Sequence, residues 1–187
     1  MTIKLLAFAA SLRKESWNRK LLSVAVPYAE AAGASVSVRQ FREFEGPMYD
    51  QDIFNESGLP PGPQAFADAL GAVDGIILAT PEYNYSIAGT LKNLIDWVSR
   101  VRPTPLRGRS AVLLSTSTSV VGGARGLWQT RIPLEGCGVS VYPGMFFNGP
   151  ALHLFADDGL SLRDPKMAEG IGRLMGEYVE WAGKLKG

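Results

Sequence analysis

The chain has 187 residues, of which 46% are hydrophobic and 20% charged, values typical of one globular domain spanning residues 1–187. Its single cysteine and single histidine exclude an intrachain disulfide and the usual Cys/His zinc sites, so we expect no metal site. A formal net charge of +1 gives no reason to expect a nucleic-acid partner. Because no apolar stretch is long enough for a membrane span or a signal-peptide core, we expect a cytoplasmic protein without a membrane span.

Apolar runs alternate with helical patterns in the first part of the chain. Residues 3–9 are almost continuously apolar, which predicts a strand buried on both faces. Residues 16–32 carry apolar side chains every three or four positions and predict a helix that ends at Gly33. A short alternating segment at 36–38 predicts an edge strand. The prolines and glycines of residues 41–63 predict a long loop.

The rest of the chain continues the alternation of strands and helices. The predicted elements are a helix from about residue 64, a strand at 75–80, a loop at 81–88, a helix at 91–98, a strand at 110–114, a polar, glycine-rich segment at 115–126, a helix near 127–134, a short strand at 139–141 and a helix at 165–181. Five strands with interposed helices predict a doubly wound α/β fold with three layers. Ligands bind such sheets at the carboxyl ends of the strands, where residues 10–18, 81–88 and 115–126 would meet.

The first of these segments combines hydroxyl groups, a guanidinium group and the start of a helix. Ser11 and Ser16 can donate hydrogen bonds, Arg13 can form a charge-assisted contact, and the free N–H groups of the helix start attract an anion. A phosphate monoester would satisfy all of these groups. The alternative is that Ser16 only caps the helix and Arg13 is solvated.

The other two segments have the components of a site for a flat ring. Residues 80–86 offer backbone amides, the Asn84 amide and two tyrosines, which suit the edge of a heteroaromatic ring. Alternatively, Asn84 is an ordinary turn residue and Glu82 a solvated carboxylate. In residues 115–126 the glycines permit close approach of the backbone to a planar ligand, although a flexible serine-rich loop has the same composition.

Three motifs together resemble one known family. They are Ser-Leu-Arg-Lys-Glu-Ser-Trp-Asn at 11–18, Pro-Glu-Tyr-Asn-Tyr-Ser at 81–86 with its continuation to Trp97, and Gly-Gly-Ala-Arg at 122–125. The chain resembles the NAD(P)H-dependent FMN reductases of flavodoxin-like fold, in particular the chromate and quinone reductases. This resemblance implies a five-stranded parallel sheet of order 2-1-3-4-5. It does not extend to the details of residues 142–162.

The resemblance also implies which residues bind FMN. The phosphate would be held by Ser11, Arg13, Ser16, Trp17 and Asn18, through their amides and side chains. The edge of the isoalloxazine ring would be wrapped by Pro81, Glu82, Tyr83 and Asn84, mainly through main-chain groups. The far side of the ring would meet Thr116 and Ser117, with Gly122 and Gly123 keeping that wall low enough for a second ring to stack.

The function implied is hydride transfer from NADPH or NADH to FMN and then, by a ping-pong mechanism, to quinone, chromate, azo or ferric acceptors. Since the flavin supplies the reactivity, we assign no catalytic acid, base or nucleophile. A flavodoxin-like electron carrier without NAD(P)H oxidase activity is the alternative, although a net charge of +1 is unlike the one-signed surface that carriers need. A binding module without activity is a third interpretation.

The resemblance further implies a homodimer or homotetramer. Tyr85, Trp97, Arg100 and Arg125 are placed where contacts between subunits would occur. Trp97 lies beside Leu94 and Ile95 in a helical pattern, however, and a tryptophan in such a position more often belongs to the core of one chain.

Overall fold

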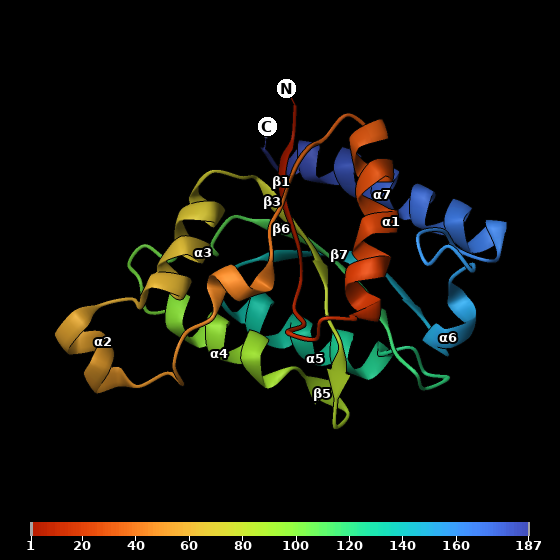
Figure 1. Cartoon of the computed structure of the whole chain (residues 1–187). Helices are drawn as coiled ribbons and strands as arrows, with labels where there is room; N and C mark the ends of the chain where they lie inside the picture. The colour runs from red at the N-terminus through yellow and green to blue at the C-terminus, as the bar shows by residue number, and fades with distance from the viewer. Residues whose placement is uncertain (1, 187) are drawn as a thin grey trace.

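Five parallel strands lie at the centre of the computed structural model, which describes residues 2–186 (Figure 1). Neighbouring strands follow the order β2-β1-β3-β6-β7. Their bounds are β1 (Lys4–Ala9), β2 (Ser35–Val38), β3 (Gly75–Ala79), β6 (Ser110–Thr116) and β7 (Ser140–Asn148). Because β4 and β5 form a separate hairpin, the main sheet has the order 2-1-3-4-5 when only its own strands are counted. The predicted fold is confirmed.

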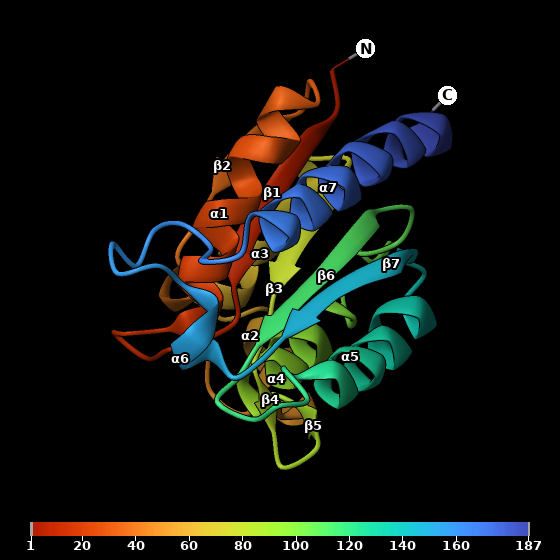
Figure 2. The ribbon, with the colours of Figure 1, turned by 90° about the vertical axis from the view of Figure 1, so that its right-hand side faces the viewer.

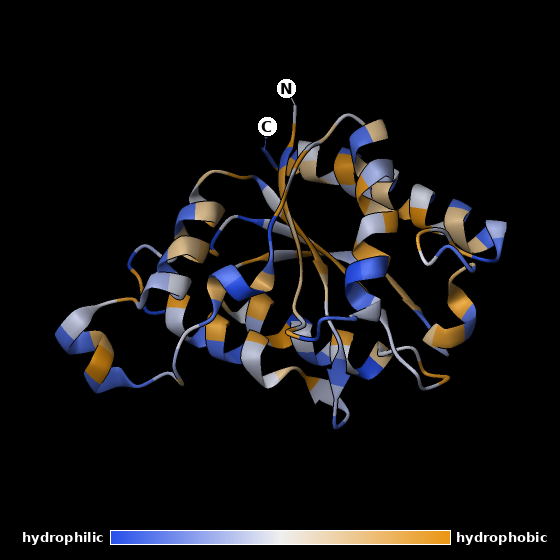
Figure 3. Cartoon of the chain, viewed as in Figure 1, coloured by the Kyte–Doolittle hydropathy of each residue, from blue (hydrophilic) through white to orange (hydrophobic). Residues whose placement is uncertain are grey.

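The burial of the strands explains their composition. β3 and β6 are buried along their whole length, and β1 is buried from its second residue onward. Helices cover both faces of these strands, so no position of the central strands favours a polar side chain. β2 lies at the edge and is mostly exposed, as its alternating sequence predicts. Figure 3 shows the contrast between the apolar central strands and the mixed colours of the helices around them.

Two layers of helices enclose the sheet (Figure 2). One face is covered by α1 (Trp17–Ala31) and α7 (Pro165–Lys186), which pack against each other. The other face is covered by α3 (Pro61–Gly71), α4 (Gly89–Val98) and α5 (Ala124–Gly136).

A buried tyrosine fastens α7 to the sheet. The Tyr178 hydroxyl accepts a hydrogen bond from the Ile76 N–H at 3.2 Å and donates to the Ile76 carbonyl at 3.1 Å. It also lies 3.0 Å from the Ser110 hydroxyl. Burial raises the pKa of Tyr178, so the neutral hydroxyl is the form that makes these bonds.

The prediction of a long loop over residues 41–63 is wrong. This segment contains a 3₁₀ helix, η1 (Phe41–Phe44), and a short helix, α2 (Gln51–Ser57), as well as the start of α3. Phe41 and Phe44 are buried and pack on the ring of Phe8, which gives this glycine- and proline-rich segment its own apolar anchor. α2 has no buried residue and projects from the body of the protein (Figure 1).

Several other boundaries also differ from the predictions. The fifth strand is β7, nine residues long instead of three, and it is irregular because its register against β6 shifts between Ala111 and Leu113. β6 continues to Thr116, so the first two residues of the predicted polar segment are strand residues. The loop at 81–88 contains a hairpin of β4 (Glu82–Tyr83) and β5 (Ser86–Ile87). A further short helix, α6 (Ala151–Leu154), was not predicted.

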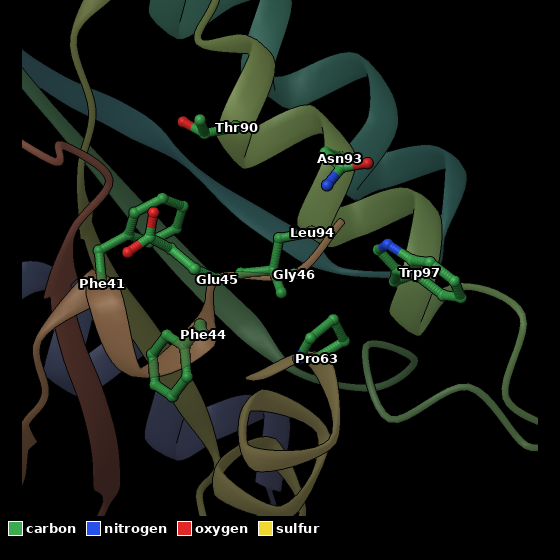
Figure 4. Close-up of a pocket in the computed structure, with 9 residues that line it drawn as sticks. All are labelled: Phe41, Phe44, Glu45, Gly46, Pro63, Thr90, Asn93, Leu94 and Trp97. Carbon is green, nitrogen blue, oxygen red and sulfur yellow. The ribbon is translucent and has the colours of Figure 1, made fainter. Parts of the chain in front are cut away.

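Trp97 belongs to the core. Its side chain is fully buried, and its indole N–H donates to the Pro47 carbonyl at 2.8 Å. It lines a small cavity of about 50 Å³ between α4 and the segment around η1, together with Phe41, Phe44 and Asn93 (Figure 4). The interpretation of Trp97 as a core residue is therefore confirmed, and the alternative of a contact with a partner subunit is wrong, because packing within one chain already covers this side chain.

Candidate functional site

The loops that follow β1, β3 and β6 line one cavity of about 250 Å³ at the carboxyl edge of the sheet. Its lining residues are Ser11, Arg13, Ser16, Trp17, Asn18, Pro81, Glu82, Tyr83, Thr116, Ser117 and Thr118. The structure thus brings together all of the predicted site residues except Asn84, Gly122 and Gly123. Thr118 was not singled out from the sequence, because nothing in the serine- and threonine-rich run of 115–119 distinguishes it.

One end of this cavity is rich in hydrogen-bond donors. The Ser16 hydroxyl caps α1 by accepting from the Arg19 N–H at 3.3 Å, so the capping role first considered as an alternative is real. The backbone N–H groups of Trp17 and Asn18, in the first turn of α1, have no acceptor within residues 2–186. This is usual at the start of a helix, where the first N–H groups have no partner within the helix. Ser11 is 5% exposed, and its hydroxyl, whose oxygen is not fully buried, has no hydrogen bond within the same residues.

Arg13 adds a positive charge to this end of the cavity. Its side chain is exposed and forms no ion pair or side-chain hydrogen bond in the described part of the chain. The Arg13 guanidinium is therefore free to meet an anion held by the helix start. Glu82 is the one carboxylate among the residues that line the cavity, and its charge is balanced by Arg125. No carboxylate therefore competes with an anion for Arg13.

The side chain of Asn18 has a different role from the one predicted. Its amide donates to the Thr116 carbonyl and its oxygen accepts from the Thr116 N–H, each at 3.0 Å. These two bonds fasten the start of α1 to the end of β6. One amide N–H and the amide oxygen of Asn18 are thus engaged within the protein, which leaves the second amide N–H and the backbone N–H of Asn18 for a ligand.

The hairpin after β3 forms the opposite side of the cavity. Asn84 and Tyr85 occupy the two central turn positions with φ of 49° and 66°, as a two-residue hairpin of matched twist requires. Asn84 is thus the turn residue of the alternative interpretation, and it does not line the cavity. The left-handed conformation is unfavourable for a tyrosine. The Arg125 guanidinium lies over the Tyr85 ring, 4.1 Å from its centroid, and supports this conformation.

A buried carboxylate fixes the hairpin to α5. One carboxylate oxygen of Glu82 accepts from Arg125, at 2.8 Å from Nε and 2.6 Å from Nη2, and the other accepts from the Gly126 N–H at 3.0 Å. Burial acts to raise the pKa of Glu82, but the hydrogen bonds from Arg125 and Gly126 outweigh it and hold this pKa below its ordinary value. Glu82 is therefore an ionised clamp and not a solvated surface residue.

The close approach of α5 to the hairpin depends on a glycine. A Cβ at Gly126 would lie 2.9 Å from both Cα and Cβ of Glu82, so any larger residue would push the two elements apart. Sequence reasoning missed this role of Gly126 and the partnership of Arg125 with Glu82. The only signal was an Arg-Gly pair after two glycines, which does not indicate a contact 43 residues away.

The glycines of the third segment act for another reason than predicted. Both have positive φ, of 63° at Gly122 and 89° at Gly123. A Cβ at Gly122 would collide with the backbone of Asn148, and one at Gly123 with the Ser115 hydroxyl, so their missing side chains face the protein interior. They allow the segment to pack on β6 and β7, and they do not lower a wall of the cavity.

This arrangement defines a class of protein. A five-stranded parallel sheet of this order, with three loops around a cavity at its carboxyl edge, is the flavodoxin-like architecture. A flavodoxin from the domain Archaea has the same fold at a TM-score of 0.57, with 12% identity over 95% of this chain and 99% of that one. At this identity the likeness shows the fold alone.

The family follows from closer comparisons. The model of the NADPH-dependent FMN reductase family matches residues 3–152. An NAD(P)H-dependent FMN reductase of Pseudomonas aeruginosa is 34% identical over 191 residues, covering 99% of this chain and 98% of the relative. A quinone reductase of Escherichia coli K12 is 38% identical over 130 residues, covering 69% of this chain and 68% of the relative.

A solved structure agrees with this assignment. FerB, a flavoenzyme NAD(P)H:(acceptor) oxidoreductase from Paracoccus denitrificans, superposes with a TM-score of 0.83 and 27% identity, with 98% of both chains covered. The chain therefore belongs to the NADPH-dependent FMN reductase family, and it is an NAD(P)H-dependent oxidoreductase with FMN as its cofactor.

The donors of the cavity suit this cofactor. One end offers helix-start N–H groups, a hydroxyl and a guanidinium that have no partner in the part of the chain that the structure describes. These donors match a phosphate monoester, which carries negative charge and several acceptor oxygens. Within residues 2–186, no cluster of three or more His, Cys, Asp or Glu side chains could hold a metal ion. In the same residues, none of the helices combines the length and hydrophobicity needed to cross a membrane.

Proposed function

We propose that this chain binds FMN in the cavity at the carboxyl edge of the sheet and reduces quinones with NADPH or NADH. Chromate, azo compounds and ferric complexes are further acceptors in this proposal. The phosphate would be held by Ser11, Arg13, Ser16 and the N–H groups of Trp17 and Asn18, while Pro81, Glu82 and Tyr83 would meet the ring edge and Thr116 and Ser117 its far side. The names of the quinone reductase and FMN reductase relatives support the choice of acceptor and donor.

The observation that carries the proposal is the pairing of two unlike ends in one cavity. The end near α1 concentrates donors without carboxylates, as a phosphate requires, whereas the end near the hairpin offers backbone groups and the half-exposed Tyr83 ring. An anion and a flat ring on one ligand would use both ends at once. Binding by the phosphate alone would leave the hairpin end without a role.

The protein contributes binding and orientation in this mechanism. Bound FMN supplies the hydride and electron chemistry. Glu82 is the one carboxylate among the described residues that line the cavity, and it is not available as a base because Arg125 and Gly126 hold it as a carboxylate. The clamp keeps the main chain of β4 in a fixed position, and its N–H groups can then stabilise negative charge at the ring edge without reorganisation.

The proposal is tested on the purified protein. Its visible spectrum should show bound flavin that bleaches on addition of NADPH or NADH, and steady oxidation of the coenzyme should follow when a quinone is added. Initial rates with both substrates varied should give parallel double-reciprocal lines, since donor and acceptor use the same face in turn. Intersecting lines would contradict the shared site, and bleaching without turnover would favour the electron carrier.

We further propose a homodimer or homotetramer of a single-domain chain in the cytoplasm. Support for assembly comes from exposed apolar side chains on the hairpin and α5, two elements that contact each other. They are Tyr83, Tyr85, Trp128 and Ile132. Light scattering should give two or four times the mass of 20.2 kDa, and a monomer at micromolar concentration would contradict this part of the proposal.

A further inference from the structure

A second cavity, of about 460 Å³, lies at the opposite edge of the sheet and is lined by three arginines, Arg100, Arg102 and Arg107. It opens where α4 and α5 end and just before β6 begins. Helices in this fold run antiparallel to the strands, so the ends of helices and the starts of strands share the amino edge. The cavity at residues 11–18 lies at the carboxyl edge, so the two cavities are distinct.

The charge of this second cavity is not balanced by acidic side chains. No Asp or Glu lines it, and none of the three arginines forms an ion pair within residues 2–186. The acid on the preceding turn of α4, Asp96, is bound to Lys92, with 2.7 Å between Nζ and a carboxylate oxygen. That pair contributes no net negative charge.

Backbone carbonyls offset only part of the positive charge. Arg102 donates to the carbonyl of Ser99, the C-cap of α4, at 2.6 Å and to the carbonyl of Val101, beyond the end of α4, at 3.2 Å. A helix end carries about half an elementary negative charge, so two helix ends balance about one of the three guanidinium groups. A positive potential therefore remains over the cavity.

Of the three arginines that line this cavity, Arg107 has the fewest interactions with the described residues. Its side chain makes no hydrogen bond or ion pair within the described residues, although the loop that carries it is fixed. The Gly108 N–H donates to the Gly138 carbonyl at 3.0 Å, which joins this loop to the turn after α5. The backbone that carries Arg107 is therefore fixed at the cavity, while the Arg107 side chain has no partner there within the described residues.

We infer that this cavity is a second anion site, which takes a small, multiply charged oxyanion such as phosphate, pyrophosphate or a phosphomonoester. Three guanidinium groups offer several N–H donors each, and the hydroxyl residues Ser99 and Thr104 also line the cavity. The volume exceeds that of one phosphate group, which leaves room for a second phosphate or an organic part. The inference is independent of the function proposed for the other cavity.

The chain contains its own reporter for this site. Cys137, its only cysteine, lines the second cavity and is partly exposed. Labelling rates can be compared between dithiobis(nitrobenzoate), a dianion, and dithiodipyridine, which is neutral and reacts by the same thiol–disulfide exchange. The ratio of the two rates cancels the effect of Cys137 burial and reports the local potential. The FMN-loaded protein is used so that phosphate does not compete at Arg13.

The expected result has two parts. Arg107→Gln should lower the anionic-to-neutral rate ratio at least about twofold, whereas Arg107→Lys and the control Arg173→Gln, an exposed arginine on α7, should leave it near the wild-type value. Pyrophosphate or glycerol phosphate should slow labelling of Cys137 saturably, and Arg107→Gln should raise the half-protecting concentration about fivefold.

Two outcomes would overturn the inference. One is an equal rate ratio in Arg107→Gln and Arg173→Gln, which would show that the cavity has no special potential. The other is a labelling rate of Cys137 that neither anion changes. A rate that both anions lower without saturation, and equally in all variants, would count against the inference in the same way, because it would reflect ionic strength alone. Stronger protection by glycerol phosphate than by inorganic phosphate would support an organic ligand in the remaining volume.

Discussion

Replacing Glu82 with glutamine tests whether the clamp between the hairpin and α5 organises the cavity in which we propose that FMN binds. The substitution keeps the size of the side chain but removes the charge that both Arg125 and Gly126 meet. If the amide oxygen keeps the bond to Gly126, the amide NH₂ faces the Arg125 guanidinium, donor against donor. The variant therefore loses at least the ion pair.

The magnitude follows from the exposure of the two partners. The Glu82 side chain is 8% exposed, whereas that of Arg125 is 42% exposed, so solvent screens part of the pair. Hydrogen bonds to charged groups contribute about 1.5–3 kcal/mol when they are well shielded. With screening, we expect Glu82→Gln to lower the free energy of unfolding by about 1–2 kcal/mol. If the loosened hairpin must be ordered on binding, FMN dissociation constants should rise about fivefold to thirtyfold.

The assay is denaturant unfolding of the apoprotein together with FMN titration followed by flavin fluorescence. The control is Glu180→Gln, which removes a carboxylate from an exposed pair with Lys184 on α7 and should leave stability and FMN affinity unchanged. Equal behaviour of the Glu82 and Glu180 variants would refute the clamp. A double variant with Arg125→Gln should cost little more than Glu82→Gln alone, because both changes remove the same interaction.

The contacts of Glu82 with Arg125 and Gly126 also determine the direction in which the stability of the protein changes with pH. Because the pKa of Glu82 is lower in the folded protein than the ordinary value of about 4.3, its contribution to stability is complete above that pH. The contribution is lost as the pH falls through the lower folded pKa. Wild-type stability should therefore decrease more steeply on acidification than that of Glu82→Gln, and parallel curves would contradict the assignment.

Three further substitutions have defined outcomes. Arg13→Ala should raise the FMN dissociation constant about tenfold, which is at the low end for contacts to charged groups because Arg13 is exposed. The control Lys14→Ala should leave this constant unchanged. Equal FMN affinities of the two variants would show that Arg13 does not hold the phosphate. Asn18→Ala should cost about 1–3 kcal/mol of unfolding free energy, since two buried bonds to β6 are lost. Tyr178→Phe should cost a similar amount in urea unfolding, and Tyr142→Phe, whose hydroxyl bond to Glu177 is exposed, much less.

The predictions that succeeded depend on short-range patterns. Continuous apolar runs in the central strands, and the spacing of apolar residues in α1, reflect burial by neighbouring layers, which acts on every residue of an element. The residues predicted at 11–18 lie at one end of a cavity, because one loop and the helix start after it are adjacent in the sequence; that they bind a phosphate stays a prediction.

The predictions that failed depend on contacts between distant segments. The apolar anchor of residues 41–63 is the burial of Phe41 and Phe44 against Phe8, which no periodicity within the segment reveals. β7 is long because β6 offers it a partner up to Thr116. The backbone of Asn148 fills the space that a side chain at position 122 would need. The role of Gly122 could therefore not be assigned from the sequence of the loop that contains it.

The amino-acid sequence alone determined that this protein has an α/β fold and carries the motifs of the NADPH-dependent FMN reductase family, since strand burial and these motifs are encoded within single segments. Only the tertiary structure decided which polar side chains remain free for a ligand. Asn18 and Glu82 bond to partners 98 and 43 residues away, whereas the Arg13 side chain has no partner within residues 2–186. A polar side chain becomes available only when no buried partner claims it, and such partners are brought together by the complete fold.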